Sequence, residues 1–196
     1  LFLVEDGSPG LSVSKKLSKT GMWASDTAEL VFDEVRVSGT NLLGQEGEGF
    51  YHLVAGLQRE RLLSAVLCIS AADQTLTDTV EFLGQRRAFG KSLSKFQALR
   101  HRIADLLTEV EAARQLTYHA VRKFVAGQDC TTEVSMAKLF ASEMANRVSY
   151  EAVQMHGGLG YMRELPVERF ARDYRLWTIA AGSSEMMREI IAKSAI

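Results

Sequence analysis

The chain has 196 residues, of which 46% are hydrophobic and 24% are charged, so it can bury a sizeable core, and an intrinsically disordered chain is excluded. Its net charge of −1 gives no electrostatic attraction for nucleic acid or for an anionic membrane, and neither is expected as a partner. The longest apolar run, LLSAVLCISAA, is shorter than the roughly 20 residues that span a bilayer, so no membrane span is expected.

Residues 1–44 carry the signals of β-strands. The opening stretch LFLVEDGSPGL predicts a strand followed by a turn. In TAELVF the positions of Ala28, Leu30 and Phe32 alternate with those of Thr27 and Glu29, which is the period of a strand. We therefore expect a partial antiparallel β-domain over residues 1–44, and a chain that begins within that domain.

From GEGFYHLV onward, apolar residues recur at helical spacing, which predicts an up-and-down bundle of four or five helices over residues 45–196. TTEV is typical of a helix start and HGG of a helix end. The expected fold class is therefore α+β, a partial antiparallel β-domain followed by a C-terminal helical bundle. The residues expected to share a face are Leu53, Leu57, Ser64 and Leu67 on the first helix, Leu99, Ile103, Leu106 and Val110 on the second, and Val134, Lys138, Ala141 and Ala145 on the third.

The two cysteines, Cys68 and Cys130, lie in helical patterns. Neither has the partner spacing of a metal site or of a disulfide framework, so both are expected to be buried free thiols. His156 has no second histidine or acid at the spacing of metal ligands. No metal site is predicted, and His156 is expected to be a packed or capping side chain.

A carboxylate stands out in GLQRERLLSAV. Glu60 follows Leu57 by three residues and precedes Leu67 by seven, so the spacing predicts that it lies on the core side of the helix. The residues one turn away include no cation, so no ion pair within the helix is expected. Two interpretations remain open: a general base that faces an apolar cavity, or a salt bridge to an arginine of another helix.

Two further stretches have both a structural and a functional interpretation. GQRRAFGKSL places Arg86 and its neighbour at a helix end, where cations offset the helix dipole; the alternative is a guanidinium that binds a phosphate. QMHGGLGY contains three glycines in four positions, which either end the helix or let the backbone approach a ligand closely.

The stretch WTIAAGSSEMMREI predicts a loop that leads into a helix N-terminus, where free N–H groups suit an anionic or strongly polar partner. No side chain in IAAG can carry a proton, so acid–base chemistry there must come from elsewhere. Ser183 or Ser184 is the expected N-cap, with Glu185 in the first turn. The alternative is simply a well-capped helix.

In this order the stretches resemble the acyl-CoA dehydrogenase family over essentially the whole chain. The resemblance rests on KTGMWASDTAELVFDEVRV, NLLGQEGEGF, RRAFGKSLSKFQ, QMHGGLGY, LPVERFARD and AGSSEMMREIIAK. It covers the second half of the family's middle β-domain and the complete C-terminal helical domain. The family's N-terminal helical domain and the strands that cover the flavin are expected to precede Leu1, so the chain is expected to be a fragment.

The resemblance implies an enzyme that uses FAD for α,β-dehydrogenation of an acyl-CoA thioester, in which a carboxylate removes an α-proton while the β-hydride passes to FAD. Most members carry the base as a Glu at the position of Ala181. A branch similar to the long-chain and isovaleryl-CoA dehydrogenases carries it on the first bundle helix, immediately before an arginine, and LQRERLL fits that pattern. The resemblance therefore assigns the base to Glu60, and the small Ala181 favours long or branched acyl chains.

The resemblance also implies the remaining roles. The residues expected to hold FAD are Arg86, Gln97, Gln154, Met155, His156, Gly157, Gly158, Ser183, Ser184 and Glu185, and those expected to meet the acyl-CoA are Gln58, Arg61, Ala181 and Gly182, with the Ala181 N–H on the thioester carbonyl. Arg86 and the glycine run commonly serve a neighbouring subunit, which implies a homodimer or homotetramer. The expected electron acceptor is electron-transfer flavoprotein or a similar protein, and the expected location is the cytoplasm of a bacterium or the mitochondrial matrix of a eukaryote.

Two other function classes remain open. A flavin monooxygenase of related fold needs no base and would tolerate Ala181, and a non-catalytic homologue could serve as an assembly partner. The carboxylate at Glu60 favours the dehydrogenase over both.

Overall fold

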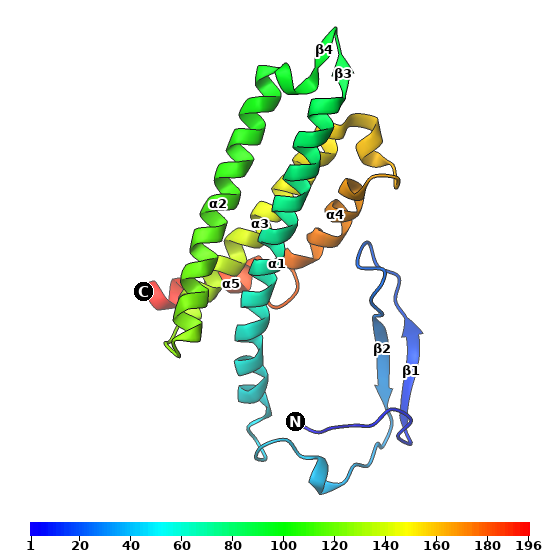
Figure 1. Cartoon of the computed structure of the whole chain (residues 1–196). Helices are drawn as coiled ribbons and strands as arrows, with labels where there is room; N and C mark the ends of the chain where they lie inside the picture. The colour runs from blue at the N-terminus through cyan, green and yellow to red at the C-terminus, as the bar shows by residue number, and fades with distance from the viewer. The chain divides into compact units, whose positions relative to one another are not determined.

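The computed structural model describes residues 1–196, which divide into two compact units, Leu1–Leu57 and Gln58–Ile196. Five α-helices and two small two-stranded sheets make up the chain (Figure 1). No helix combines the length and the apolar composition that crossing a bilayer requires. The expected class, a β-part followed by a helical bundle, is confirmed.

The first unit contains one antiparallel hairpin. Strand β1, Leu11–Lys16, pairs with β2, Ala28–Phe32, with an irregularity in register between Val13 and Lys15. The strand predicted in TAELVF is confirmed. The strand predicted in the opening stretch is wrong, because that stretch forms only an isolated bridge from Phe2 to Leu42 before two glycine turns. A short 3₁₀ helix, η1, occupies Gly39–Asn41.

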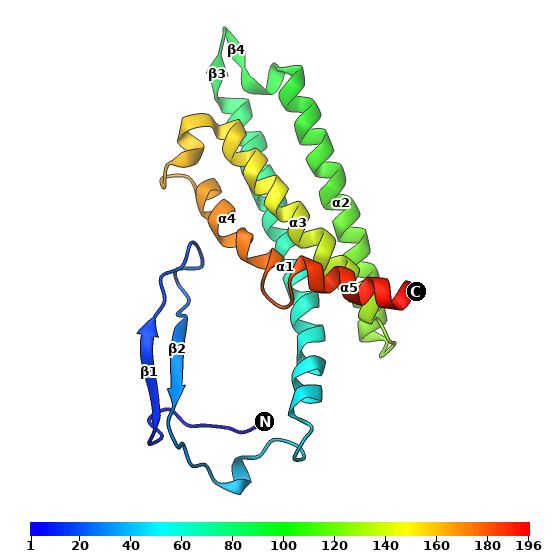
Figure 2. The ribbon, with the colours of Figure 1, turned by 180° about the vertical axis from the view of Figure 1, so that it is seen from behind.

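The helices of the bundle run as follows: α1 over Gly49–Gln85, which begins in the first unit, α2 over Gln97–Val125, α3 over Thr131–His156, α4 over Pro166–Tyr174 and α5 over Ser184–Ala195. A small hairpin, β3 (Arg87–Ala88) with β4 (Lys91–Ser92), and the 3₁₀ helix η2 (Leu93–Lys95) connect α1 to α2. The 3₁₀ helices η3 (Gly157–Tyr161) and η4 (Arg175–Thr178) flank α4. In Figures 1 and 2, α1, α2 and α3 lie side by side, and α4 and α5 pack on α3.

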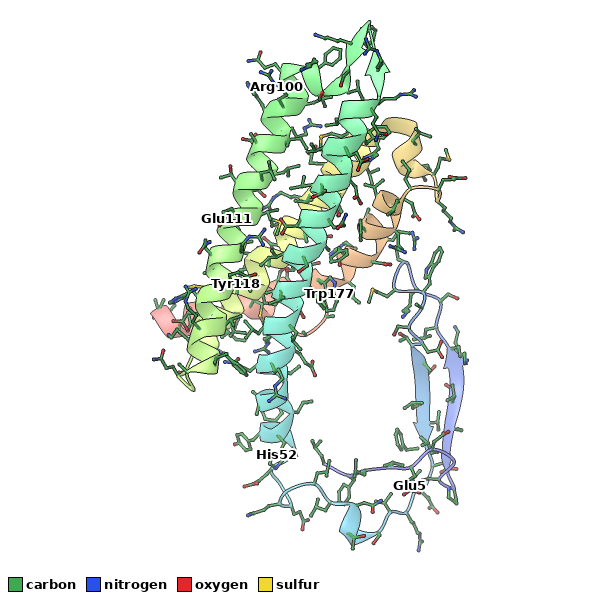
Figure 3. The ribbon with its side chains drawn as sticks, viewed as in Figure 1. Glu5, His52, Arg100, Glu111, Tyr118 and Trp177 are labelled. Carbon is green, nitrogen blue, oxygen red and sulfur yellow. The ribbon has the colours of Figure 1, made fainter.

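The core lies among α1, α2 and α3. Many of its members are alanines, such as Ala65 on α1, Ala113 on α2 and Ala141 on α3, and small side chains let helix backbones approach closely. Trp177 of η4 is partly buried and packs against this core (Figure 3). Glu111 of α2 lies on the exposed side of that helix. The face predicted for the third helix is confirmed, because all four of its residues are buried.

Most of the face predicted for the first helix is wrong, although Ser64 on it is buried. Glu60 is exposed, and Leu67 on the same side is 49% exposed. The buried stripe of α1 lies next to it and begins with Arg61, Leu62 and Ala65. Because α1 carries leucines on both sides, apolar spacing alone does not identify which side packs inward.

The cysteines behave as expected. Cys68 on α1 and Cys130, directly before α3, are both buried and free. Burial raises the pKa of the Cys68 thiol to about 12, with the Lys138 ammonium acting in the opposite direction. The two thiols are therefore packing groups within the bundle.

Candidate active site

The loop between η4 and α5 has an unusual backbone. Ala181 has a φ of +56° and Gly182 a φ of +104°, so two consecutive residues lie at positive φ, and for an alanine that region is strained. The loop ends at Ser183, whose Oγ accepts a hydrogen bond from the Met186 N–H at 3.4 Å and caps α5. The predicted cap is confirmed at Ser183.

Arg61 reaches this loop from α1. Its side chain is buried, and Nε donates to the carbonyl oxygen of Ala181 at 3.0 Å. Burial lowers the pKa of the Arg61 guanidinium, and the neighbouring Glu60 carboxylate partly offsets that effect. The guanidinium therefore anchors the loop backbone.

Lys138 reaches the same loop from α3. Its side chain is fully buried, and Nζ donates to the carbonyl oxygen of Gly182. Burial lowers the pKa of this ammonium. The sequence pattern placed Lys138 on a buried face but gave it no role. A lysine between Val134 and Ala141 on such a face indicates a buried hydrogen-bond partner, because lysine is rarely fully buried without one.

Glu60 lies one residue before Arg61, on the exposed side of α1. Its carboxylate is close enough to the Arg61 guanidinium to raise the pKa of that group. Gln58 is not brought to the loop, because its Nε2 donates to Thr131 Oγ1 at 3.1 Å, at the start of α3. The structure therefore joins Arg61, Ala181 and Gly182 but leaves Gln58 apart from them.

The first turn of α5 adds polar groups next to the loop. Ser184 is buried and its Oγ has no hydrogen-bond partner in the chain. Glu185 is exposed, and hydrogen bonds from its own backbone N–H and from Ser183 lower the pKa of its carboxyl. A carboxylate in the first turn also complements the helix dipole.

A second group of predicted residues meets at the other end of α1. Arg86 and the run from Gln154 to Gly158 line one pocket of about 480 Å³, together with Phe82, Leu93, Leu159 and Met162. Gln97 does not line this pocket and lies exposed at the first residue of α2. Arg86 is exposed, so its guanidinium is open to a ligand.

His156 forms the base of this pocket. Its ring is buried, stacks on Phe82 with 4.2 Å between centroids, and places Nδ1 2.8 Å from the Ala152 carbonyl oxygen. The expected packed histidine is confirmed, and Phe82 is a lining residue that sequence reasoning missed. At Gly157 and Gly158 a side chain would meet no atom within 4 Å, so the backbone there is open to close approach.

Comparisons with known proteins agree with this arrangement. The family model described as "Acyl-CoA dehydrogenase, C-terminal domain" matches residues 47–196. The mitochondrial long-chain specific acyl-CoA dehydrogenase of Rattus norvegicus is 42% identical over 196 residues, which are 100% of this chain and 46% of the relative. The short-chain specific acyl-CoA dehydrogenase of Megasphaera elsdenii is 42% identical over 185 residues, 94% of this chain and 48% of the relative.

The fold of the chain also matches solved structures. The crystal structure of an acyl-CoA dehydrogenase from Geobacillus kaustophilus superposes with a TM-score of 0.96 at 44% identity, and the match covers 99% of this chain and 51% of that one. The chain thus spans about half the length of the relatives it matches. On the family model, the relatives and the fold, this chain belongs to the acyl-CoA dehydrogenase family.

Proposed function

We propose that the protein carrying this chain is an FAD-dependent acyl-CoA dehydrogenase in which Glu60 is the general base. The observation that carries the proposal is the position of Glu60, one residue before the arginine that binds the Ala181 carbonyl. In most members of the family the base stands at the position of Ala181. Glu60 is the chain neighbour of Arg61, the α1 residue whose side chain donates a hydrogen bond to this loop.

The residues of the loop have a complementary role. The N–H groups of Ala181 and Gly182 have no acceptor within the chain, and N–H groups directed at a developing negative charge stabilise it. In the proposed reaction, a carboxylate oxygen of Glu60 takes the α-proton while the Ala181 N–H donates to the thioester oxygen. Ala181 itself contributes no acid or base.

The residues lining the 480 Å³ pocket fit the pyrophosphate or adenosine side of FAD. Arg86 offers an exposed guanidinium, and the open backbone at Gly157 and Gly158 allows close approach, which suits a phosphate group. A solved structure of PigA with FAD and proline, 29% identical with a TM-score of 0.95, supports the cofactor assignment. When bound, FAD accepts the β-hydride.

Ser183, Ser184 and Glu185 are proposed to meet the flavin of FAD at the α5 N-terminus, whereas the Arg86 pocket, at the other end of α1, is proposed to serve the FAD of a neighbouring subunit. The buried and unpartnered Oγ of Ser184 is a donor that this role would satisfy. Gln97, Gln154, Met155 and His156 complete the proposed cofactor set, and Gln58, Arg61 and Gly182 the acyl-CoA set. In this assignment Arg61 acts through the backbone of Ala181.

The acyl group is proposed to be long or branched, because Ala181 leaves space where most members have a glutamate. Long-chain and isovaleryl-CoA dehydrogenases are among the relatives, at 42% and 37% identity, but so is a short-chain specific enzyme at 42%, so the proposal rests on Ala181. We also propose that residues 1–44 and 45–196 belong to separate domains, and that the protein forms a homodimer or homotetramer. Its proposed location is the cytoplasm in a bacterium or the mitochondrial matrix in a eukaryote.

The proposed acceptor is electron-transfer flavoprotein or a similar protein. A chain in the solved structure of the electron transferring flavoprotein of Acidaminococcus fermentans is 38% identical to this chain, with a TM-score of 0.95. The experiment that tests the function is anaerobic mixing of the flavin-loaded complete protein with straight-chain and branched acyl-CoA thioesters. Bleaching of the flavin absorbance by one of them is expected. No bleaching by any thioester, with FAD bound, would contradict the dehydrogenase.

A further inference from the structure

The fully buried lysine of α3 needs an explanation that packing does not supply. Lys138 has no exposed surface, and its Nζ donates to the carbonyl oxygen of Gly182, 44 residues away. Burying an ammonium costs free energy that a hydrogen bond recovers only in part, and an apolar side chain of similar volume often packs as well or better. Stability alone therefore does not explain why a lysine, and not an apolar residue, occupies this position.

The contact is one of a pair on consecutive residues. Arg61 from α1 donates to the Ala181 carbonyl at 3.0 Å, and Lys138 from α3 donates to the Gly182 carbonyl. Two cations from two different helices thus hold two adjacent carbonyls of one loop. Both residues of the loop are at positive φ, a conformation that persists only where its surroundings determine it.

The direction of the carbonyls fixes the direction of the amides. All peptide bonds of the chain are trans, so the N–H of each peptide points opposite to its carbonyl. With the Ala181 carbonyl held by Arg61, the Gly182 N–H points away from the guanidinium, and with the Gly182 carbonyl held by Lys138, the Ser183 N–H points away from the ammonium. The Ala181 N–H belongs to the preceding peptide, which is joined to the held peptide through Ala181 at a φ of +56°. The Ala181 and Gly182 N–H groups have no acceptor in the chain.

Helix α5 does not depend on Lys138 for its attachment. Arg188 of α5 pairs with Glu143 of α3 at 2.6 Å, and Met187 is fully buried. Helix α5 therefore packs on α3 through contacts besides the Lys138 hydrogen bond. The hydrogen bond of Lys138 therefore acts on the conformation of the loop.

We propose that Lys138 is a positioning residue that, together with Arg61, fixes the Ala181–Gly182 backbone so that its free N–H groups meet the thioester oxygen of the substrate. The proposal rests on the dehydrogenase function proposed above. Lys138 does not touch the substrate and acts through the Gly182 carbonyl. Its removal leaves the base at Glu60 in place and loosens the donors.

The test compares Lys138→Met with Lys123→Met in the flavin-loaded complete protein. Lys123 of α2 pairs with Glu133 of α3, so its variant loses a cation from the same bundle without touching the loop. For Lys138→Met we expect kcat to fall by about 10- to 100-fold, since a misplacement near 1 Å costs about that much. KM and FAD content should stay near wild type, because the loss falls on the transition state. Lys123→Met should keep kcat.

A second readout needs no turnover. Amide hydrogen exchange over residues 179–184 of the resting protein should be faster in Lys138→Met than in wild type and unchanged in Lys123→Met. Wild-type kcat or wild-type exchange in Lys138→Met overturns the proposal. If the wild-type protein oxidises no acyl-CoA, the proposed function fails, while the exchange experiment still decides whether Lys138 orders the loop.

Lys138→Gln is made in parallel for the case in which Lys138→Met does not fold. Glutamine keeps a polar group in the cavity, but its shorter side chain does not reach as far as the lysine ammonium. We expect lower kcat and faster exchange over 179–184 in this variant too. Wild-type values of both in a folded Lys138→Gln protein overturn the proposal equally.

Discussion

The Arg61 side chain connects two segments that lie 120 residues apart, because its Nε donates to the carbonyl oxygen of Ala181 at 3.0 Å. Residue 60 precedes the donor, and residue 181 provides the acceptor. One hydrogen bond therefore links Ala181, where most family members carry their base, to the residue that follows the proposed base Glu60. The first two predictions follow from this relationship.

Glu60→Gln in the complete protein removes the proposed base and keeps the size of the side chain. We expect kcat to fall by about 10²- to 10⁴-fold, the contribution typical of general acid–base catalysis. FAD content and the melting temperature should not change, because Glu60 is exposed and is not part of the core. Steady-state kinetics with a dye acceptor measure the effect. Near-native turnover with flavin bound would show that Glu60 is not the base.

Ala181→Glu added to Glu60→Gln restores a carboxylate at the commoner position of the family. Part of the lost kcat should return, because the hydrogen bond from Arg61 to Ala181 brings residue 181 to the part of α1 that carries residue 60. Recovery should be incomplete and best with straight-chain substrates, because a misplaced base loses about 10²-fold per ångström and the new side chain fills the space proposed for the acyl group. An equal lack of activity in single and double variants counts against a shared α-proton.

Two glycines of η3 provide a matched pair for the second pocket. A Cβ at Gly160 would lie 2.5 Å from the Val153 carbonyl oxygen, whereas one at Gly158 would meet no atom within 4 Å. Gly160→Ala should therefore lower the free energy of unfolding by about 1–3 kcal/mol, the usual cost of overpacking. Gly158→Ala should leave stability within about 0.5 kcal/mol of wild type and weaken FAD retention.

Denaturant unfolding and flavin content after gel filtration measure the two effects separately. Equal stability of the two variants would mean that Gly160 is not packed as described. Unchanged flavin content in Gly158→Ala would remove the glycine run from the proposed cofactor site.

The buried thiol of Cys68 predicts a loss of stability at alkaline pH. Above the ordinary pKa of 9.0 the thiol ionises in the unfolded chain, whereas in the folded chain its pKa is about 12. Between these values the unfolded state binds fewer protons, so the free energy of unfolding falls as pH rises, by at most about 1.4 kcal/mol per pH unit. The stability lost in this window is fully present below pH 9.

Cys68→Ala should remove that part of the pH dependence, and the measurement is the difference in unfolding free energy between wild type and variant from pH 8 to pH 11. The difference isolates the thiol because Lys138, which contributes in the opposite sense, is present in both proteins. Its lowered pKa means that the unfolded state binds more protons just below pH 10.5, which raises stability with pH. Parallel curves for the two proteins would contradict the assignment.

The sequence was informative where the cue is local. TTEV marked the start of α3, the glycine after His156 marked its end at a φ of +61°, and Ser183 was among the two expected caps. Each of these depends on a few neighbouring residues. The inward side of α1 was not predictable in this way, because leucines lie on both its exposed and its buried side: Leu63 is 56% exposed and Leu62 is 6% exposed.

The contacts that shape the candidate site were beyond local reasoning. Lys138 and Gly182 are 44 residues apart, and Arg61 and Ala181 are 120 residues apart. The meeting of Arg86 with the glycine run was implied by resemblance, and the structure brings them into one pocket but leaves Gln97 outside it. Such pairings depend on how three helices pack, which no short stretch encodes.

The loop at Ala181, at positive φ, is held by its backbone and not by its side chain. The shape of the loop is held through main-chain oxygens, by Arg61 at residue 181 and Lys138 at residue 182. The side chain at 181 takes no part in either hydrogen bond. A change of the side chain at 181 therefore leaves both hydrogen-bond acceptors in place, so the chemistry offered at this position is separable from the contacts that hold the loop.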